Sequence, residues 1–220
     1  GLLLVGANPR ITHVNEIDKS RKQSLEYQGF SKITSDNAAE PFPEMMHKAH
    51  DVVVTNPPFA SWDDTKFDKE RIIQKYFHKH RGLANHIRLE YLMAGLALYT
   101  MKDDGKAAII IMGHVYFGDD GLFAKYHPFF NWLYRHYKVD DIINMNSYKL
   151  YNKQGAVTKT MLILIGGRKA TPKGVAPNES EQPHLEDMVE TFEDLWTRTK
   201  SHIKPHIDTI IQQLKIAQTQ

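Results

Sequence analysis

Short apolar runs alternate with amphipathic stretches along most of the chain. Strands are predicted where β-branched and other apolar residues form short runs bounded by polar residues, at 11–17, 31–34, 52–55, 107–112, 139–145 and 160–165. Helices are predicted where apolar residues recur at helical spacing, chiefly at 19–28, 87–102 and 123–137. This alternation predicts an α/β fold with a mostly parallel sheet and helices on both faces.

The last two predicted strands have no predicted helix between them, so we expect them to pair antiparallel as a C-terminal hairpin. Residues 103–106, Asp-Asp-Gly-Lys, are expected to form a turn before the strand at 107–112. Beyond residue 168 the sequence becomes rich in Pro, Gly and polar residues. We therefore expect one domain at 1–168, a linker at 169–184 and a helical C-terminal extension at 185–220.

The composition narrows the kinds of site that the chain can carry. Its 220 residues suffice for one α/β domain with a full core. The absence of cysteine excludes disulfides and thiolate sites, and is consistent with a reducing cytoplasm, the localisation that we expect. The 12 histidines are scattered without the spacing of metal ligands, so no metal site is predicted. No apolar run approaches the roughly 18 residues of a membrane span, so no membrane association is expected.

The most informative segment is 51–59, where a short β-branched strand ends in Asn56, Pro57, Pro58 and Phe59. Each proline fixes φ near −65° and lacks an N–H donor, so the chain leaves the strand as a stiff turn. This turn presents acceptors, the Asn56 side-chain oxygen and the Pro57 carbonyl, followed by an aromatic ring. Two oxygens can accept both hydrogens of a planar amino group while Phe59 stacks on its ring. The alternative interpretation is a proline-terminated strand before a loop.

Polar residues also follow the first two predicted strands. Glu16 and Ile17 end the first strand, and Asp36 and Asn37 follow the second. Ligands of open α/β sheets lie beyond the carboxyl ends of the strands. One carboxylate there can accept both hydroxyls of a ribose, and a second carboxylate beside a free N–H matches the edge of an adenine. Alone, either acidic residue could equally be a helix N-cap.

In this order and spacing, the three strand ends resemble those of class I S-adenosylmethionine-dependent methyltransferases, and among them the DNA adenine-N6 enzymes. The resemblance covers about residues 1–168 and implies a Rossmann-like sheet, S-adenosylmethionine as cofactor and DNA as partner. It assigns the cofactor to Glu16, Ile17, Asp36, Asn37 and Asn56. It assigns catalysis to the Asn-Pro-Pro-Phe turn, Asn56 through Phe59.

The resemblance extends to the C-terminal hairpin, whose aromatic residues can help to hold an extruded base. It assigns substrate binding to Phe59, Tyr148 and Tyr151. For the two tyrosines the alternative is that they pack within the hairpin. The expected activity is methylation of the N6 amino group of adenine in DNA, by direct transfer to a flipped-out base, as in restriction–modification.

One departure from the family pattern concerns the start of the chain. The family begins with a strand that ends in a Gly-rich turn, whereas residues 1–5, Gly-Leu-Leu-Leu-Val, resemble the helix after that turn. We therefore expect an N-terminally truncated fragment without the first strand and the glycine loop. That strand normally lies between those ending at Glu16 and Asn56. Its absence predicts a gap in the sheet, an exposed edge capable of self-association, and impaired cofactor binding and activity.

Other activities fit the same turn. Related enzymes with Asn-Pro-Pro-aromatic turns act on guanine N2 of ribosomal RNA or on a glutamine amide, and each of these groups is a planar amine. RNA is therefore the alternative partner to DNA. A further alternative is a non-catalytic, methyltransferase-like module that binds nucleic acid or a partner chain.

Overall fold

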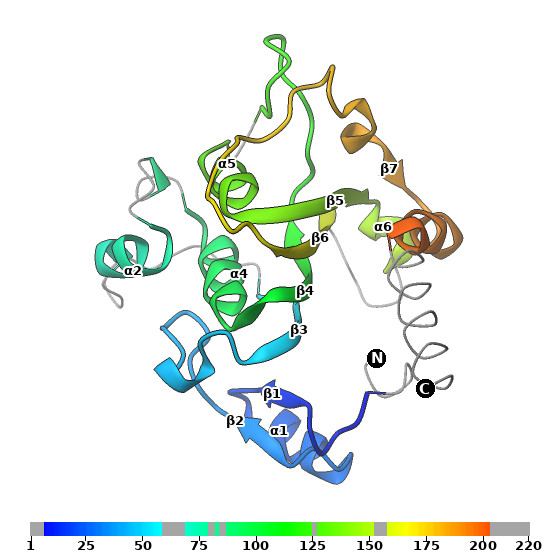
Figure 1. Cartoon of the computed structure of the whole chain (residues 1–220). Helices are drawn as coiled ribbons and strands as arrows, with labels where there is room; N and C mark the ends of the chain where they lie inside the picture. The colour runs from blue at the N-terminus through cyan, green and yellow to red at the C-terminus, as the bar shows by residue number, and fades with distance from the viewer. Residues whose placement is uncertain are drawn as a thin grey trace, which may run out of the picture.

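The computed structural model describes residues 7–58, 69–78, 82–83, 87–124, 127–151 and 158–202. Within them the strands and helices alternate as the hydrophobic pattern predicts (Figure 1). The strands are β1 His13–Asn15, β2 Lys32–Thr34, β3 His50–Thr55, β4 Met101–Met112, β5 Tyr137–Met145, β6 Thr160–Arg168 and β7 Met188–Val189. The helices are α1 Lys19–Tyr27, α2 Lys69–Tyr76, α4 Leu89–Tyr99, α5 His127–His136 and α6 Ser147–Leu150, with residues 192–202 also helical.

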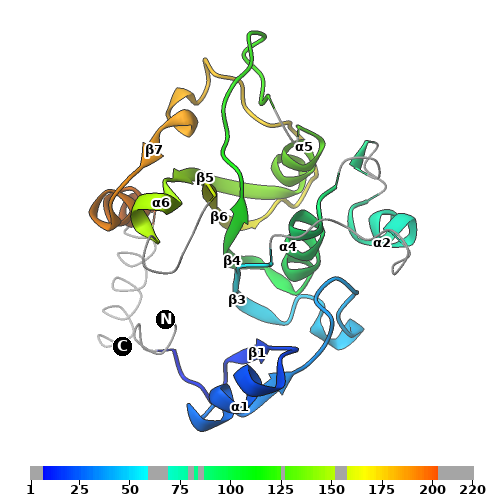
Figure 2. The same ribbon diagram turned by 180° about the vertical axis from the view of Figure 1, so that it is seen from behind.

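The described strands form two sheets. β1 and β2 pair in parallel, and the other five strands lie in the order β3-β4-β6-β5-β7 (Figures 1 and 2). β3 is parallel to β4, β6 is antiparallel to both β4 and β5, and β7 is parallel to β5. The α/β class is therefore confirmed, with its mostly parallel strands and a C-terminal antiparallel hairpin, β5–β6.

The expected break in the sheet lies between β1 and β3. No pairing joins these two strands within the described residues. The two sheets instead meet at His13 and His50, the first residues of β1 and β3, whose ring centroids are 5.6 Å apart in an edge-to-face contact. In Figure 2, α1 and its two strands form a layer of their own below the larger sheet.

One face of the larger sheet carries the main hydrophobic core. Helices α4 and α5 cover this face, and α2 packs on the outer side of α4 (Figure 1). Large buried side chains fill this core, among them Phe77, which directly follows α2, Tyr91 of α4 and Trp132 of α5. Phe77 lies against Gly95 of α4, where an added Cβ would come within 2.2 Å of the phenyl ring. Glycine at this position therefore lets the aromatic side chain approach the helix backbone.

The opposite face of the larger sheet is covered by the C-terminal part of the chain. A second buried cluster forms there from Ile143 and Met145 of β5, Leu150 of α6 and Val189 of β7, with Leu195 packed against it. Helical cover is thus present on both faces. Near β3 this cover ends, and Val52 and Val54 are 63% and 57% exposed.

The prediction of a turn at 103–106 is wrong. Helix α4 ends at Tyr99, and β4 already begins at Met101. The register between β3 and β4 runs from His50–Met101 to Val52–Lys106, so the residues between Met101 and Lys106 bulge out of a continuous ladder. Pairing with β3 on both sides of the bulge overrides the local turn preference of Asp-Asp-Gly.

The segment after β6 returns to the sheet. A 3₁₀ turn at Pro183–Glu186 leads into β7, which pairs Asn144 with Met188 and Met145 with Val189. The division into a domain, a linker and an extension stays a prediction. In the structure, Lys169 and Lys173 of the expected linker donate backbone hydrogen bonds to α5, whereas residues of the expected extension pack on β5 and α6.

Candidate active site

Glu16 directly follows β1 and is tied to the second strand. Its N–H donates to the Thr34 carbonyl over 3.0 Å. One carboxylate oxygen accepts the Asp18 N–H at 2.9 Å, and the other lies 3.2 Å from Arg21 Nε, with 21% of the Glu16 side chain exposed. Ile17 is 63% exposed. Glu16 is therefore fixed at the strand end but still reaches solvent.

Asp36 and Asn37 follow β2 and lie beside the end of β1. The Asn15 amide donates to the Asp36 carbonyl and accepts the Asp36 N–H, both at 2.9 Å, and it also accepts the Thr34 hydroxyl at 2.8 Å. The Asn37 side-chain oxygen accepts the Ala39 N–H at 3.1 Å. The structure thus brings the predicted residues of the first two strand ends together.

Asn15 was missed as a site residue by the sequence interpretation. Its amide carries a donor and an acceptor, so it can bond both the backbone N–H and the backbone carbonyl of one residue, Asp36, which a carboxylate cannot. An asparagine placed one residue before the strand-end acid is the available signal. Because asparagine is also common in turns, the sequence alone does not show that Asn15 joins the two strand ends.

The Asn56 turn leaves the larger sheet at the end of β3. Thr55 is the last residue of β3 in register with β4, opposite Ile109. Pro57 is buried, whereas Asn56 and Pro58 are exposed. The Asn56 side chain makes no hydrogen bond with any described residue, so its amide remains available. Phe59 lies outside the described residues.

Four of the five predicted cofactor residues follow strands of the smaller sheet, whereas the fifth, Asn56, belongs to the turn on the larger sheet. Glu16, Asp36 and Asn37 follow β1 and β2, whereas Asn56 follows β3, and no hydrogen bond or ion pair among the described residues links the two groups. The site predicted at the carboxyl ends of the strands therefore consists of two separate groups, one after β1 and β2 and one after β3.

A buried ion pair near the turn was also missed. Glu90, in the first turn of α4, is completely buried, and its Oε1 lies 2.6 Å from Arg88 Nε. Burial raises the pKa of Glu90. Arg88 Nη2 lies 3.7 Å from Met112 Sδ, three residues past Ile109, the partner of Thr55. This pair therefore sits at the edge of the sheet from which Asn56 emerges.

Tyr148 and Tyr151 lie at the same edge of the sheet. β5 is parallel to β3 because both are related through β4 and the antiparallel β6, so α6 follows the carboxyl end of β5. Tyr148 is 55% exposed. Tyr151 meets Phe192 edge-to-face, with ring centroids 5.8 Å apart, and burial raises its pKa. Tyr151 thus makes packing contacts, and a role in substrate binding stays a prediction for both tyrosines.

The described part of the chain also lacks two other features. No group of three or more His, Asp or Glu side chains there is placed to hold a metal ion. Nor does any helix in that part combine the length and the apolar character that crossing a bilayer requires.

The alternating strands and helices form a Rossmann-like α/β fold. A family model described as N-6 DNA Methylase matches residues 16–213. The chain belongs to this N-6 DNA methylase family.

Two solved structures are similar to parts of the chain. The type IIG restriction endonuclease BpuSI is similar with 19% identity and a TM-score of 0.40 over 64% of this chain and 16% of its own. A protein described as a class I S-adenosylmethionine-dependent methyltransferase of Listeria monocytogenes is similar with 14% identity and a TM-score of 0.48. That likeness covers 84% of this chain and 58% of the Listeria chain. No curated protein sequence matches the chain.

Proposed function

We propose that this chain carries the amine-binding part of an S-adenosylmethionine-dependent methyltransferase that methylates N6 of adenine in DNA. The observation that carries the proposal is the state of Asn56. Its side chain is exposed, lacks a hydrogen bond to any described residue, and lies between Thr55, the last residue of β3, and Pro57, which is buried. An exposed amide on a fixed backbone is suited to binding a ligand rather than to stabilising the fold.

The turn supplies the two acceptors that an amino group needs. An exocyclic amine conjugated to a purine is a weak nucleophile because its lone pair is delocalised into the ring. Hydrogen bonds from its two hydrogens to Asn56 Oδ1 and to the Pro57 carbonyl favour a pyramidal nitrogen with a localised lone pair. Both prolines hold these acceptors in place before substrate arrives, so positioning contributes much of the expected catalysis.

The donor set at the first two strand ends fits the cofactor of this family. Glu16 retains 21% exposure of its side chain and would accept the ribose hydroxyls. Asp36 is exposed, and the Asn37 N–H has no acceptor among the described residues, so the two would meet the adenine amino group and ring nitrogen. When bound, S-adenosylmethionine supplies a methyl group made electrophilic by its sulfonium. The chain itself positions the cofactor-binding residues at the ends of β1 and β2 and the amine-binding turn at the end of β3.

The test compares two substitutions at one position. Asn56→Ala removes the acceptor and is expected to lower methyl transfer to adenine in DNA by at least about a hundredfold, the range for loss of one positioned hydrogen-bond group. Asn56→Asp keeps an acceptor oxygen and is expected to retain more activity than Asn56→Ala. Cofactor affinity, measured by calorimetry, should fall much less than methyl transfer with Asn56→Ala, because Glu16, Asp36 and Asn37 remain in place.

Product analysis distinguishes the alternatives. N6-methyladenine after hydrolysis of the DNA supports the proposal, while methylated guanine from RNA or a methylated glutamine amide contradicts it. Full activity of Asn56→Ala would remove the role assigned to the turn. DNA binding without any methyl transfer would favour a non-catalytic module.

A further inference from the structure

Arg88 lies immediately before helix α4, at the edge of the larger sheet that carries the Asn56 turn. The helix leads directly into β4 and packs on it, so its first residues lie near the carboxyl end of that strand. Arg88 Nη2 is accordingly 3.7 Å from Sδ of Met112, the last residue of β4. Met112 is three residues beyond Ile109, the partner of Thr55 in β3. At about 3.3 Å per residue and about 4.8 Å between strands, Met112 lies about 8 Å from the position of Asn56.

Arg88 is fixed through both its backbone and its side chain. Its carbonyl accepts the N–H groups of Tyr91 and Leu92, both at 3.1 Å, which closes the first turn of α4. Its Nε lies 2.6 Å from Oε1 of Glu90, whose side chain is completely buried, whereas 29% of the Arg88 side chain is exposed. Because an unpaired buried charge is costly, Glu90 keeps the guanidinium at this place. The guanidinium is therefore anchored and still partly open to solvent.

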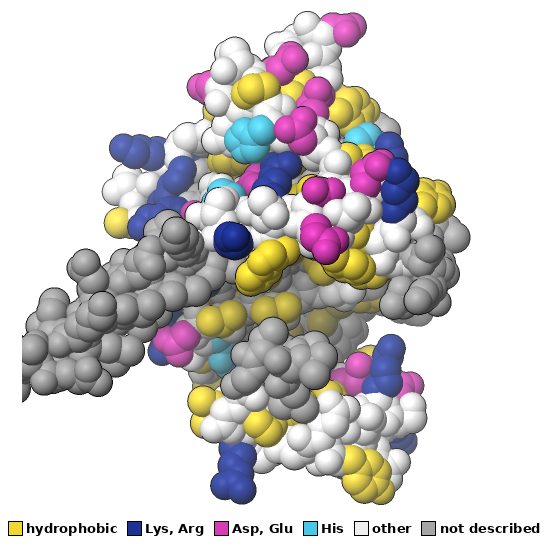
Figure 3. Space-filling model, turned by 90° about the vertical axis from the view of Figure 1, so that its right-hand side faces the viewer, with side chains coloured by type: hydrophobic (Ala, Val, Ile, Leu, Met, Phe, Trp, Pro, Cys, Tyr) yellow, Lys and Arg dark blue, Asp and Glu magenta, His cyan; other side chains and the backbone are white. Residues whose placement is uncertain are grey.

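The charge of this pair determines what kind of group the guanidinium can bind. The carboxylate of Glu90 compensates the positive charge of Arg88, so the pair as a whole attracts phosphate weakly. Positive and negative side chains are also interspersed, without a dominant sign, on the side of the molecule that carries α6 (Figure 3). A compensated guanidinium still offers N–H donors in a fixed plane. The group that fits Arg88 is therefore an uncharged hydrogen-bond acceptor rather than a phosphate.

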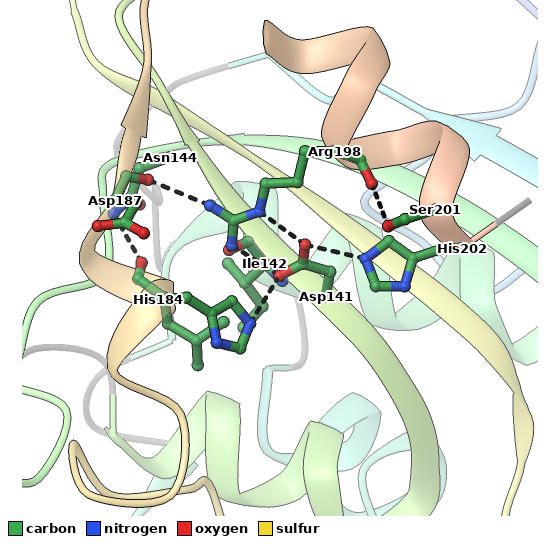
Figure 4. A network of polar contacts seen from close by, with 9 residues as sticks. Asp141, Ile142, Asn144, His184, Asp187, Arg198, Ser201 and His202 are labelled. Carbon is green, nitrogen blue, oxygen red and sulfur yellow. Dashed lines mark hydrogen bonds and ion pairs between the residues drawn. The ribbon is translucent and has the colours of Figure 1, made fainter.

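A second buried carboxylate, Asp141 of β5, is also paired with an arginine, but this pair joins two parts of the fold. Asp141 is 2% exposed and accepts two hydrogen bonds from Arg198, at 2.7 and 2.8 Å, with His202 Nε2 at 3.1 Å (Figure 4). Arg198 also donates to the Ile142 carbonyl at 3.1 Å. These contacts fix the 192–202 helix to β5. Arg198 therefore provides a matched control for the loss of an arginine from a buried ion pair.

An adenine held by the Asn56 turn presents uncharged acceptors of this kind. The turn offers two acceptors to the hydrogens of the N6 amino group, and the ring nitrogens on either side of that group, N1 and N7, each need a donor. Two hydrogen bonds of about 2.9 Å each, with the edge of the purine between them, span a distance of the order that separates the turn from Arg88.

We propose that Arg88, oriented by Glu90, donates a hydrogen bond to the ring nitrogen beside the amino group of the target adenine, N1 or N7. The inference rests on the proposed function and adds to it a residue that selects the base. Phosphate contacts position a nucleic acid, whereas contacts to the edge of a base specify it. Arg88 would thus supply the donor, and the turn the acceptors, of one adenine-specific set.

The experiment measures kcat/KM for methyl transfer to synthetic duplexes that contain the adenine found methylated in the product analysis. In two further duplexes this adenine is replaced by 1-deazaadenine or 7-deazaadenine, which keep the amino group but lack N1 or N7. The wild type is expected to lose about tenfold with one of the two analogues, the effect of one hydrogen bond from a charged donor. Arg88→Gln should lose about tenfold with adenine itself and nothing further with that analogue, so its ratio of adenine to analogue falls to about one.

Two further variants separate recognition of the base from stability. Arg198→Gln is the control, and it should lower the free energy of unfolding while it keeps the wild-type ratio of adenine to analogue. If Arg88→Gln does not fold, Arg88→Met combined with Glu90→Gln removes both charges, so no buried carboxylate is left unpaired, and its ratio should also fall to about one.

The outcomes distinguish the inference from the proposed function. A wild type that methylates both analogues as well as adenine overturns the inference. A variant without Arg88 that keeps the wild-type ratio also overturns it. In both cases adenine is still methylated, so the proposed function stands. If the wild type methylates no adenine, the proposed function fails and the inference fails with it.

Discussion

At the scale of single residues, Asn15 determines the spacing between two strand ends. Its amide bonds both polar groups of Asp36 and the hydroxyl of Thr34. The neighbouring Glu16 is held by a separate bond to the Thr34 carbonyl. The two acids assigned to the cofactor are thus kept in register by a residue that need not touch the cofactor.

Asn15→Ala should therefore impair cofactor binding without impairing DNA binding. Loss of these side-chain bonds frees the Asp36 peptide, and we expect the Kd for S-adenosylmethionine to rise about tenfold, equivalent to roughly 1.4 kcal/mol. Calorimetry with the cofactor and anisotropy with DNA measure the two affinities separately. Gln23→Ala, on the exposed α1, is the control and should change neither. An unaltered cofactor affinity in Asn15→Ala would show that Asn15 has no positioning role.

At the scale of elements, α2 and α4 meet at the close contact of Phe77, the residue directly after α2, with Gly95 of α4. A Cβ on Gly95 would lie 2.2 and 2.5 Å from two atoms of the buried phenyl ring. Alanine is otherwise favoured over glycine within a helix by about 1 kcal/mol. The two effects oppose each other, and the short distances decide which is larger.

Gly95→Ala should lower the free energy of unfolding by about 1–2 kcal/mol, since overpacking of a core exceeds the gain in helix propensity. Urea unfolding followed by circular dichroism measures the change. In the double variant with Phe77→Leu, the smaller side chain makes room, so the combined loss should be less than the sum of the single losses. Strict additivity would indicate that the helices separate freely at this contact.

The strands and turns also differ in how far the sequence could predict them. β6 and the end of β4 were predictable because Met161–Ile165 and Ala107–Met112 are unbroken apolar runs typical of a sheet covered on both faces. The Asn56 turn was predictable because two prolines restrict the backbone locally. β7 was not, since Met188 and Val189 are two apolar residues in a polar segment and become a strand only by pairing with β5. The start of β4 and the Asn15 bridge depend likewise on distant partners.

At the scale of the whole molecule, the two sheets meet at a pair of histidines. Burial lowers the pKa of His13, although Asp36 opposes this effect and Lys32 adds to it. Burial also lowers the pKa of His50, and the charges of His13, Lys32 and Lys102 add to this effect while Asp51 opposes it. His13 Nε2 is further bonded to the Thr34 hydroxyl at 3.1 Å. Each histidine is therefore more readily protonated in the unfolded chain than in the folded one.

The free energy of unfolding should accordingly fall when the pH drops below about 6.5, the value for an unfolded histidine. The folded state then binds fewer protons than the unfolded state, and the loss continues until the lowered pKa values are passed, by at most about 1.4 kcal/mol per histidine and pH unit. Urea unfolding at pH 7.5 and 5.5 measures the difference. The variant His13→Gln with His50→Gln should show a smaller difference, and an identical one would exclude this contact as its source.

The position of β6 between β4 and β5 has a consequence for biosynthesis. The two earlier strands are synthesised before the segment that separates them, so the edge of each that pairs with β6 stays without its partner until Arg168 has been made. Meanwhile the apolar edge of β4 remains open to incorrect partners. Translation should therefore be followed by a late, cooperative closure of the larger sheet, and nascent chains halted before residue 160 should be sensitive to proteases and bind chaperones.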